Sequence, residues 1–352
     1  MNRKQYTAAA TLAVCVLLVP AMAGAQGAGT FPDFISFDGQ PEGVAVDKVG
    51  NVYASVNTPT GSDQIWKFSP SGEKSVLVDL GAPGNAAGLA VDATGNIYMC
   101  RLAVPGHGVF RVSPEGDAVL LPGTEQIVGA DALAFDQRGT LYVTEIFSGD
   151  LSTGQFGQGG IWRVPKGGSA ELWLRDDLLT GYPPFLFPYP VGANGIAFCQ
   201  GALYVINTDK ALVVRIPVLP DGGPGEPEVW KQVQDVPESF LYQSPYFPLM
   251  LDGLAMDVSG NVYIAVPSRS AVIRINAVDR SQETLAIYPP VSSDAPPVLI
   301  DAPLSLAFGT GKGERKSLFV TDSGMMGAFF PGTWPGPGLV KIQVGIPGMP
   351  LP

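Results

Sequence analysis

A phrase that occurs six times restricts the folds open to this chain more than any other feature of its sequence. It reads small residue, aliphatic residue, alanine, aliphatic residue, usually aspartate, a short turn, and then an aliphatic–aromatic–aliphatic run. The copies begin at Gly43, Gly88, Ala132, Gly195, Gly253 and Ser305, and their turn positions are Asp47, Asp92, Asp136, Cys199, Asp257 and Gly309. These turn positions lie 44 to 63 residues apart. Such a period, with inserts, is typical of β-propeller blades rather than of a solenoid.

Each copy predicts the first two strands of a blade, joined by a tight turn in which asparagine and glycine tolerate positive φ. A third run of alternating apolar and polar residues follows each copy, as a half-buried strand requires. These runs are Gln64–Phe68, Gly108–Val112, Gly160–Val164, Ala211–Ile216, Ala271–Ile275 and Gly338–Ile342. A fourth strand follows, for example at Lys74–Val78, except after Ile342, where the chain ends in a proline-rich tail. We expect Phe31–Phe37 to supply that strand and close the ring. The sequence thus predicts an all-β, six-bladed β-propeller that occupies residues 26–352 as a single domain.

The first 25 residues have the pattern of a secretory signal peptide. Arg3 and Lys4 precede an apolar stretch from Ala8 to Met22, and Ala23–Ala25 has the small residues of a cleavage site. We therefore expect a secreted or periplasmic protein that starts at Gln26 and has no segment inserted in a membrane.

The net charge excludes some classes of partner. It is −11 for the whole chain and −13 once the two cations of the leader are removed. An acidic surface disfavours nucleic acids and anionic membranes but does not disfavour cations. We expect a monomer that acts on a small molecule. The sequence leaves open whether Cys100 and Cys199 form a disulfide or are two buried thiols.

The repeat also allows its copies to be compared position by position. The residue just before each copy is, in order, Glu42, Ala87, Asp131, Asn194, Asp252 and Leu304. We call these six positions the mouth ring, because the first strands of the blades line the central channel and this position falls at one of its mouths. Four members carry oxygen ligands, whereas the positions on either side hold small or apolar residues that allow the backbones to approach closely.

Three carboxylates and one carboxamide around one axis would repel one another without a cation. Oxygen ligands without histidine or cysteine favour a hard ion, which predicts Ca²⁺ or another divalent cation bound by Glu42, Asp131, Asn194 and Asp252. Such an ion polarises a carbonyl or phosphoryl oxygen, and one carboxylate acts as base or nucleophile. The alternative is that these residues are solvated loop acids or turn caps.

Three phrases resemble the senescence marker protein/gluconolactonase family. They are PEGVAVD from Pro41, ANGIAF from Ala193 and LDGLAMDVSGNVYIA from Leu251. That family includes regucalcin-like lactonases and is related to diisopropylfluorophosphatase and the paraoxonases. The resemblance implies a six-bladed propeller, a bound divalent cation and hydrolysis of a lactone or related ester.

The resemblance also implies roles for the mouth ring. The family's metal ligands are matched by Glu42, Asn194 and Asp252, and Asp252 corresponds to the base or nucleophile. Asp131 departs from the pattern, because it stands where asparagine is usual and adds a negative charge. Leu304 is the ring residue of the sixth blade, and no histidine lies near it in the sequence.

Long inserts are expected to fall on the same face as the mouth ring. They carry many aromatic residues, which predicts a rather hydrophobic substrate, although the aromatics could instead pack the inserts onto one another. The candidate substrate-pocket residues are Asn85, Arg101, His107, Tyr189, Tyr246 and Phe329. His107 is the only histidine of the chain, and a solvated loop histidine is the alternative to a role in proton transfer.

The leading hypothesis is therefore an exported, calcium-dependent hydrolase of a lactone or related ester, with Asp252 as base or nucleophile. One alternative is a non-catalytic binding propeller whose ion is structural. Another is a lyase or a strictosidine-synthase-like enzyme on the same scaffold, because one fold serves many functions.

Overall fold

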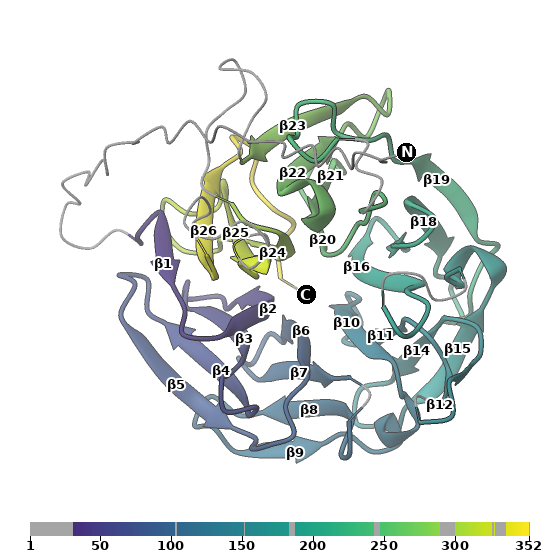
Figure 1. The fold of residues 1–352 in the computed structure, drawn as a ribbon. Helices are drawn as coiled ribbons and strands as arrows, with labels where there is room; N and C mark the ends of the chain where they lie inside the picture. The colour runs from purple at the N-terminus through teal and green to yellow at the C-terminus, as the bar shows by residue number, and fades with distance from the viewer. Residues whose placement is uncertain are drawn as a thin grey trace, which may run out of the picture.

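A computed structural model describes residues 31–102, 104–150, 152–182, 187–242, 247–288, 300–325, 327 and 336–351. Six antiparallel sheets of four strands are arranged around a central channel, as Figure 1 shows. The predicted all-β, six-bladed propeller is thus confirmed. The predicted signal peptide lies outside the described residues.

The first three blades follow the chain without a break. Blade 1 contains β2 (Gln40–Val46), β3 (Val52–Asn57), β4 (Asp63–Phe68) and β5 (Lys74–Asp79), and blade 2 contains β6 (Ala86–Val91), β7 (Ile97–Arg101), β8 (Gly108–Val112) and β9 (Ala118–Leu120). Blade 3 contains β10 (Ala130–Phe135), β11 (Leu141–Glu145), β14 (Gly160–Val164) and β15 (Glu171–Arg175), and its insert forms a hairpin of β12 (Gly149–Asp150) and β13 (Gln155–Phe156). Two single-turn 3₁₀ helices, η1 (Thr124–Gln126) and η2 (Asp177–Leu179), follow blades 2 and 3.

The last three blades complete the circle. Blade 4 contains β16 (Ala193–Cys199), β17 (Ala202–Asn207), β18 (Leu212–Pro217) and β19 (Glu228–Gln232). Blade 5 contains β20 (Leu254–Met256), β21 (Val262–Val266), β22 (Ala271–Ile275) and β23 (Gln282–Ile287), with η3 (Pro267–Arg269) after β21. Blade 6 contains β24 (Pro303–Phe308), β25 (Ser317–Asp322), β26 (Gly338–Gln343) and, as its outermost strand, β1 (Phe34–Ser36).

The ring is closed as predicted, by a strand from the start of the described chain. β1 pairs antiparallel with β26, with Phe34 opposite Val340. The paired segment is shorter than Phe31–Phe37, because its two ends turn into the core. Phe31 and Phe37 are buried, and the Phe31 ring packs edge-on against Phe319 with their centroids 4.9 Å apart. The closing segment is therefore held by side-chain packing as well as by backbone pairing.

The repeated aspartate builds the turn between the first and second strands of a blade. In blade 1, Asp47 accepts hydrogen bonds from the backbone N–H of Val49 and Asn51, from the Asn51 side chain, and from the Tyr53 hydroxyl. The same set of partners surrounds Asp257 in blade 5. These hydrogen bonds explain why aspartate, asparagine and tyrosine recur together in the repeat. That part of the repeat is structural.

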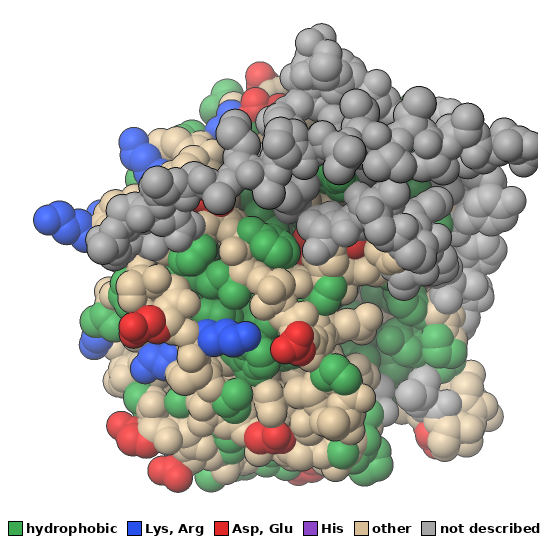
Figure 2. Space-filling view, turned by 60° about the vertical axis from the view of Figure 1, so that its left-hand side comes forward, with side chains coloured by type: hydrophobic (Ala, Val, Ile, Leu, Met, Phe, Trp, Pro, Cys, Tyr) green, Lys and Arg blue, Asp and Glu red, His purple; other side chains and the backbone are tan. Residues whose placement is uncertain are grey.

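Apolar side chains fill the space between neighbouring blades. Successive buried clusters join blade 1 to blade 2, blade 2 to blade 3, and so on around the ring to blade 6 and blade 1. Cys100 and Cys199 belong to two of these clusters, and both are buried free thiols. On the face that Figure 2 shows, acidic and basic side chains are interspersed with apolar ones.

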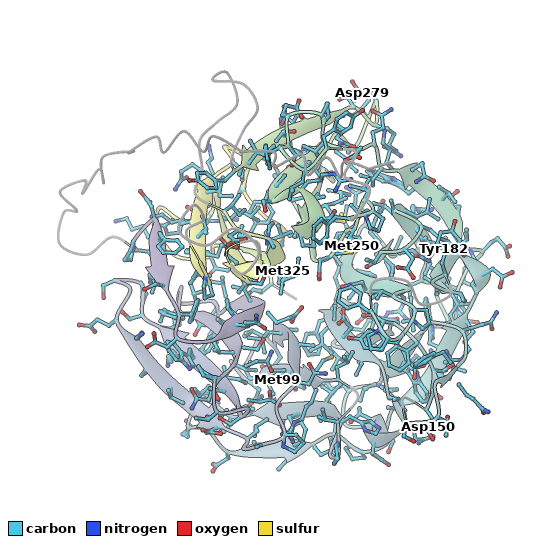
Figure 3. The ribbon with its side chains drawn as sticks, in the orientation of Figure 1. Met99, Asp150, Tyr182, Met250, Asp279 and Met325 are labelled. Atoms are coloured by element: carbon cyan, nitrogen blue, oxygen red, sulfur yellow. The ribbon has the colours of Figure 1, made fainter. Side chains whose placement is uncertain are left out.

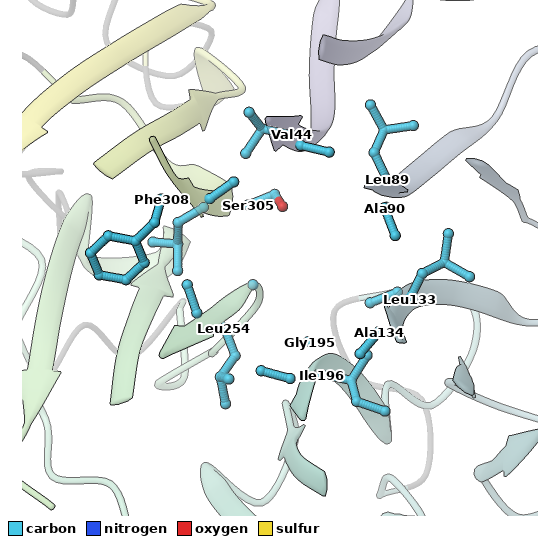
Figure 4. A pocket seen from close by; sticks show the side chains of 18 of the residues that line it. Val44, Leu89, Ala90, Leu133, Ala134, Gly195, Ile196, Leu254, Ser305 and Phe308 are labelled. Atoms are coloured by element: carbon cyan, nitrogen blue, oxygen red, sulfur yellow. The ribbon is translucent and has the colours of Figure 1, made fainter. Parts of the chain in front are cut away.

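The central channel is narrow and apolar. Its cavity has a volume of about 220 Å³ and is lined by side chains such as Val44, Leu133 and Ile196, as the close view in Figure 4 shows. The chain's last segment lies over the mouth that faces the turns between first and second strands, and the C-terminus is near the centre of Figure 1. There the Met349 N–H donates to the Met256 carbonyl at 3.1 Å. Access from bulk solvent is thus expected at the opposite mouth, where the first strands begin. Among the described residues, no helix has the length and apolar character needed to cross a membrane.

Candidate functional site

The mouth ring lies where the first strand of each blade departs from regular pairing. In five blades the register between the first and second strands shifts at this point, for example between Pro41 and Val44 and between Ala130 and Leu133. In blade 5 the strand itself begins only at Leu254, after the ring residue. A β-bulge turns a side chain away from the alternation of a regular strand. The bulges therefore set the mouth ring apart from the apolar lining of the channel.

Glycine is required beside the ring for a steric reason. A Cβ atom on Gly43 would lie 2.7 Å from the Ala87 carbonyl oxygen, and one on Gly195 would lie 2.3 Å from the Asp252 carbonyl oxygen. Both distances are far shorter than van der Waals contact. Neighbouring first strands thus approach each other closely beside the ring, as the small residues predicted.

All three carboxyl groups of the ring have raised pKa values. Burial raises the pKa of Glu42 well above its usual range, and the charges of Asp131 and Asp252 raise it further. Burial raises the pKa of Asp131 to about 7. Burial and the charge of Asp131 raise the pKa of Asp252, whereas a side-chain hydrogen bond from Asn194 lowers it. These residues, predicted from separate blades, therefore act on one another electrostatically.

The ring's donor set fits a hard divalent cation. The Glu42 Oε2 atom is buried and has no hydrogen-bond partner. In the described part of the chain, no lysine, arginine or histidine forms an ion pair with Glu42, Asp131 or Asp252. Buried carboxylates without a compensating charge are costly, and oxygen donors suit Ca²⁺. In the side-chain positions of this structure, no three carboxyl, imidazole or thiol groups in that part of the chain are close enough together to hold a metal.

Hydroxyl groups behind the ring hold its backbone, and the sequence analysis missed them. Ser55 accepts the Gly43 N–H and donates to the Ala87 carbonyl, both at 2.7 Å. Thr321 accepts the Ser305 N–H at 3.1 Å and donates to the Glu42 carbonyl. Each hydroxyl thus links the bulge of its own blade to the ring residue of the next blade. The signal was the second residue after the aromatic residue of each copy, which is Ser55, Cys100, Thr144, Ile206, Ala265 and Thr321.

Two more threonines act at the other carboxylates. Thr144 accepts the Ala132 N–H at 2.9 Å, immediately after Asp131. Thr208 donates to the Leu251 carbonyl at 2.7 Å, immediately before Asp252. Every carboxylate of the ring therefore has a threonine hydroxyl bound to its own or an adjacent peptide group.

Replacing Thr321 with valine should weaken divalent-cation binding by about tenfold, because loss of a buried hydrogen bond costs about 1–3 kcal/mol and here releases the Glu42 peptide. Calorimetric titration with CaCl₂ measures the change, and Thr321→Ser should retain the wild-type affinity. The matched control is Thr124→Val. Thr124 is also buried and accepts the Val109 N–H at 3.0 Å, but it lies in η1, outside the mouth ring. Equal loss of affinity in both valine variants would contradict a positioning role for Thr321.

The pKa shifts also predict how stability varies with pH. In the metal-free folded protein, the raised pKa values keep the ring carboxyl groups protonated at pH values where the unfolded chain has already released these protons, which it does near pH 4. The free energy of unfolding should therefore fall as pH rises from about 4 through about 7. If the ring holds a cation, saturating Ca²⁺ should oppose this fall, because a cation binds the ionised carboxylates in preference to the protonated ones. We expect the melting temperature in EDTA to drop by several degrees between about pH 5 and about pH 8, and the drop to be smaller in CaCl₂. Parallel curves in the two buffers would contradict the assignment of a cation to the ring.

Arg101 and Asn85, predicted to lie in the substrate pocket, have structural partners. The Arg101 Nε atom lies 2.7 Å from Asp63 Oδ2, and both side chains are buried. Arg101 also donates to the Gly81 and Pro83 carbonyls, and the Asn85 side chain donates to the Leu102 carbonyl at 2.9 Å. The contacts of Arg101 tie blade 1 to blade 2. The signal that sequence reasoning missed was Asp63, a carboxylate immediately before a predicted third strand.

His107 also has two backbone partners. Its Nδ1 atom lies 3.0 Å from the Val104 carbonyl oxygen and its Nε2 atom 3.0 Å from the Glu125 carbonyl oxygen. The imidazole thus links its loop to η1. Its predicted contact with substrate stays a prediction.

Tyr189 is a predicted pocket residue on which the carboxylates of the ring act electrostatically. Burial and the charges of Asp131 and Asp252 raise its pKa to about 12. Its ring packs on Phe147 with centroids 4.9 Å apart and is stacked on Phe187 at 5.9 Å. Tyr246 and Phe329 lie outside the described residues.

Figure 3 places the labelled Met250 and Met325 toward the centre of the molecule and Asp150 and Asp279 at its rim.

Comparison with known proteins gave matches among solved structures only. No protein-family description and no curated protein sequence matches the chain. Regucalcin from Agrobacterium tumefaciens strain C58, described as a calcium-binding protein, aligns with a TM-score of 0.62 at 18% identity, over 92% of this chain and 97% of that one. A gluconolactonase from Xanthomonas campestris aligns with a TM-score of 0.58 at 18% identity, over 92% of both chains. A luciferin-regenerating enzyme aligns with a TM-score of 0.62 at 15% identity, over 90% of this chain and 95% of that one. The structural neighbours thus include the proteins that the sequence phrases resemble, and at these identities the likeness establishes the fold.

Proposed function

We propose that this protein is a divalent-cation-dependent hydrolase of lactones or related esters, with Ca²⁺ as the ion. The observation that carries the proposal is the mouth ring, where three carboxyl groups with raised pKa values lie with one carboxamide and none of them forms an ion pair with a described residue. The three similar proteins named above favour a lactonase-type activity over other uses of the fold, because one of them is a gluconolactonase and one a calcium-binding regucalcin.

The residues of the mouth ring have two roles in this proposal, which are to hold the ion and to act on the substrate. Glu42, Asp131, Asn194 and Asp252 would hold the ion, which supplies a positive charge that polarises the ester carbonyl. Asp252 acts as general base or nucleophile, because the hydrogen bond from Asn194 orients it and favours its charged form. The remaining ring residues, Ala87 and Leu304, lie on either side of Glu42 in the ring and have no polar side-chain atoms, so they are not assigned to the ion.

The surroundings favour a substrate with an apolar part. The half-buried Tyr189 and the stacked Phe187 lie on the ring side of blade 4, and the buried Phe147 supports them. An aryl or alkyl group would be stabilised by burying apolar area against such a wall. A polyhydroxylated sugar lactone would bind less well, since the wall offers few hydrogen-bond partners for its hydroxyl groups. We therefore place aryl esters and alkyl-substituted lactones ahead of sugar lactones.

A substrate panel tests the proposal. Aryl acetates, alkyl-substituted γ- and δ-lactones and gluconolactone are assayed with CaCl₂, with EDTA, and after Ca²⁺ is restored. We expect hydrolysis of at least one apolar substrate that EDTA abolishes and Ca²⁺ restores. Activity that EDTA leaves unchanged would place the chemistry elsewhere. Ca²⁺ binding without turnover of any substrate would favour a binding propeller, and elimination products in place of hydrolysis products would favour a lyase.

We also propose that the protein is exported as a monomer. Expression of the whole chain in a Gram-negative host, followed by fractionation and intact-mass analysis, should give a periplasmic species that starts at Gln26. An uncleaved cytoplasmic chain would contradict this part of the proposal.

A further inference from the structure

A second comparison between the blades points to a site far from the mouth ring. Each third strand carries a cation opposite the aromatic residue of the second strand; these cations are Lys67, Arg111, Arg163, Arg215, Arg274 and Lys341. In blades 3, 4 and 5 the fourth strand supplies a glutamate opposite that cation. Arg163 pairs with Glu171 at 2.6 Å, Arg215 pairs with Glu228 at 2.8 Å, and Arg274 pairs with Glu283. The repeat therefore neutralises this cation on three successive blades.

Blade 2 departs from that pattern. The residue opposite Arg111 on the fourth strand is Val119, whose side chain is 49% exposed. Arg111 is exposed, and it forms no ion pair within the part of the chain that the structure describes. A guanidinium group thus faces solvent beside an apolar side chain where blades 3, 4 and 5 place a glutamate, and blade 1 has Ser75 at this position.

A groove of about 800 Å³ lies at this point, between blades 2 and 3. Its wall includes Val119, Leu120, Leu121 and Phe135, and Leu120 is 38% exposed. Turns between first and second strands, including Asp92–Asn96, border the groove, so it lies toward the face opposite the mouth ring.

The charges along the groove are mainly positive. Arg138 and Lys166, both exposed, line it together with Arg111. Arg138 donates one hydrogen bond, at 3.0 Å, to the Pro220 carbonyl. The one carboxylate of the lining, Asp92, accepts hydrogen bonds from the Asn96 side chain and the Tyr98 hydroxyl and so completes its own turn. Three cations around an apolar wall stand out on a chain whose net charge is −11.

We propose that this groove binds a medium-chain carboxylate, with the carboxylate on Arg111 and the alkyl chain on Val119 and Leu121, which lie on the same face of the strand. Arginine suits this role, because its planar guanidinium binds a carboxylate through two parallel hydrogen bonds. The apolar wall selects an amphiphilic anion over inorganic phosphate, which would gain nothing from it. This inference does not depend on the proposed hydrolase activity.

Calorimetric titration with octanoate, below its micelle concentration, tests the proposal, with octanamide as the neutral probe. We expect saturable binding of octanoate that weakens as NaCl rises, and at least about tenfold weaker binding of octanamide, since a charge-assisted hydrogen bond contributes about 1.5–3 kcal/mol. Arg111→Gln should weaken octanoate binding by a similar factor.

The sharper variant is Val119→Glu, which rebuilds the cation–glutamate pair of blades 3, 4 and 5 and should abolish binding without loss of fold. Val76→Glu is the matched control, because Val76 is 52% exposed on the outer strand of blade 1. Asp252→Ala should leave octanoate binding unchanged. Equal binding of octanoate and octanamide, or wild-type affinity in Val119→Glu and Arg111→Gln, would overturn the proposal, as would the absence of any octanoate binding at millimolar concentration.

Discussion

Replacing Asp252 with alanine should lower kcat/KM for the best ester or lactone substrate by about 10²–10⁴-fold, which is the usual contribution of a general base. The same change should weaken Ca²⁺ binding, because it removes one of the three ring carboxylates. Steady-state kinetics at saturating Ca²⁺ and calorimetric titration measure the two effects separately. A loss of activity that high Ca²⁺ does not restore would indicate that Asp252 takes part in the chemistry as well as in holding the ion.

Asp131→Asn is the matched control for this experiment. It keeps an oxygen donor at the same ring position and removes one of the charges that raise the pKa of Glu42 and Asp252. We expect Asp131→Asn to retain most of the activity with a modestly altered Ca²⁺ affinity. Full activity in Asp252→Ala, or an equal loss in both variants, would contradict the role assigned to Asp252.

Replacing Arg101 with methionine should destabilise the fold by about 3–5 kcal/mol, because it leaves the buried Asp63 carboxylate without its cation. Burial already raises the pKa of Asp63 even with Arg101 in place. The melting temperature should fall by roughly 10 °C. Differential scanning calorimetry measures the change, and the double variant Arg101→Met with Asp63→Asn should recover part of it.

The same variant separates a structural role of Arg101 from a role in binding substrate. If its contacts with Asp63 and the two carbonyls describe its whole function, the folded Arg101→Met protein should keep kcat/KM within a few-fold at low temperature. A large rise in KM with little loss of stability would instead favour the substrate contact that its position in the sequence suggested.

The fold could be predicted from the sequence because several independent features of the repeat each predict part of a blade. The aspartate of the turn, the tyrosine that binds it and the alternating third strand occur together, as in Asp47, Tyr53 and Lys67, and each has a local physical reason. The closing strand was predictable because the sixth blade lacked a partner for Gly338–Gln343. The exact ends of β1 were not, because Phe31 and Phe37 pack with residues far away in the sequence.

The candidate site was only partly predictable. The mouth ring appeared in the sequence because the copies differ there, but the bulges that produce it depend on pairing between two strands. The hydroxyls of Ser55 and Thr321 were missed because each acts on the next blade, a contact that no single copy contains. Arg101 and His107 were assigned from the face on which they lie, and the hydrogen bonds that they form could be found only from distances.

The pairing of β1 with β26 has a consequence for the kinetics of folding. It joins Phe34 to Val340, residues about as far apart in sequence as two contacts in this chain can be. Contacts of such separation form late and slow folding, because a long loop must be closed before they stabilise anything. Once formed, they leave blade 6 without a loose outer edge from which unfolding could begin. We therefore expect the complete circle to fold slowly and, after closure, to open slowly.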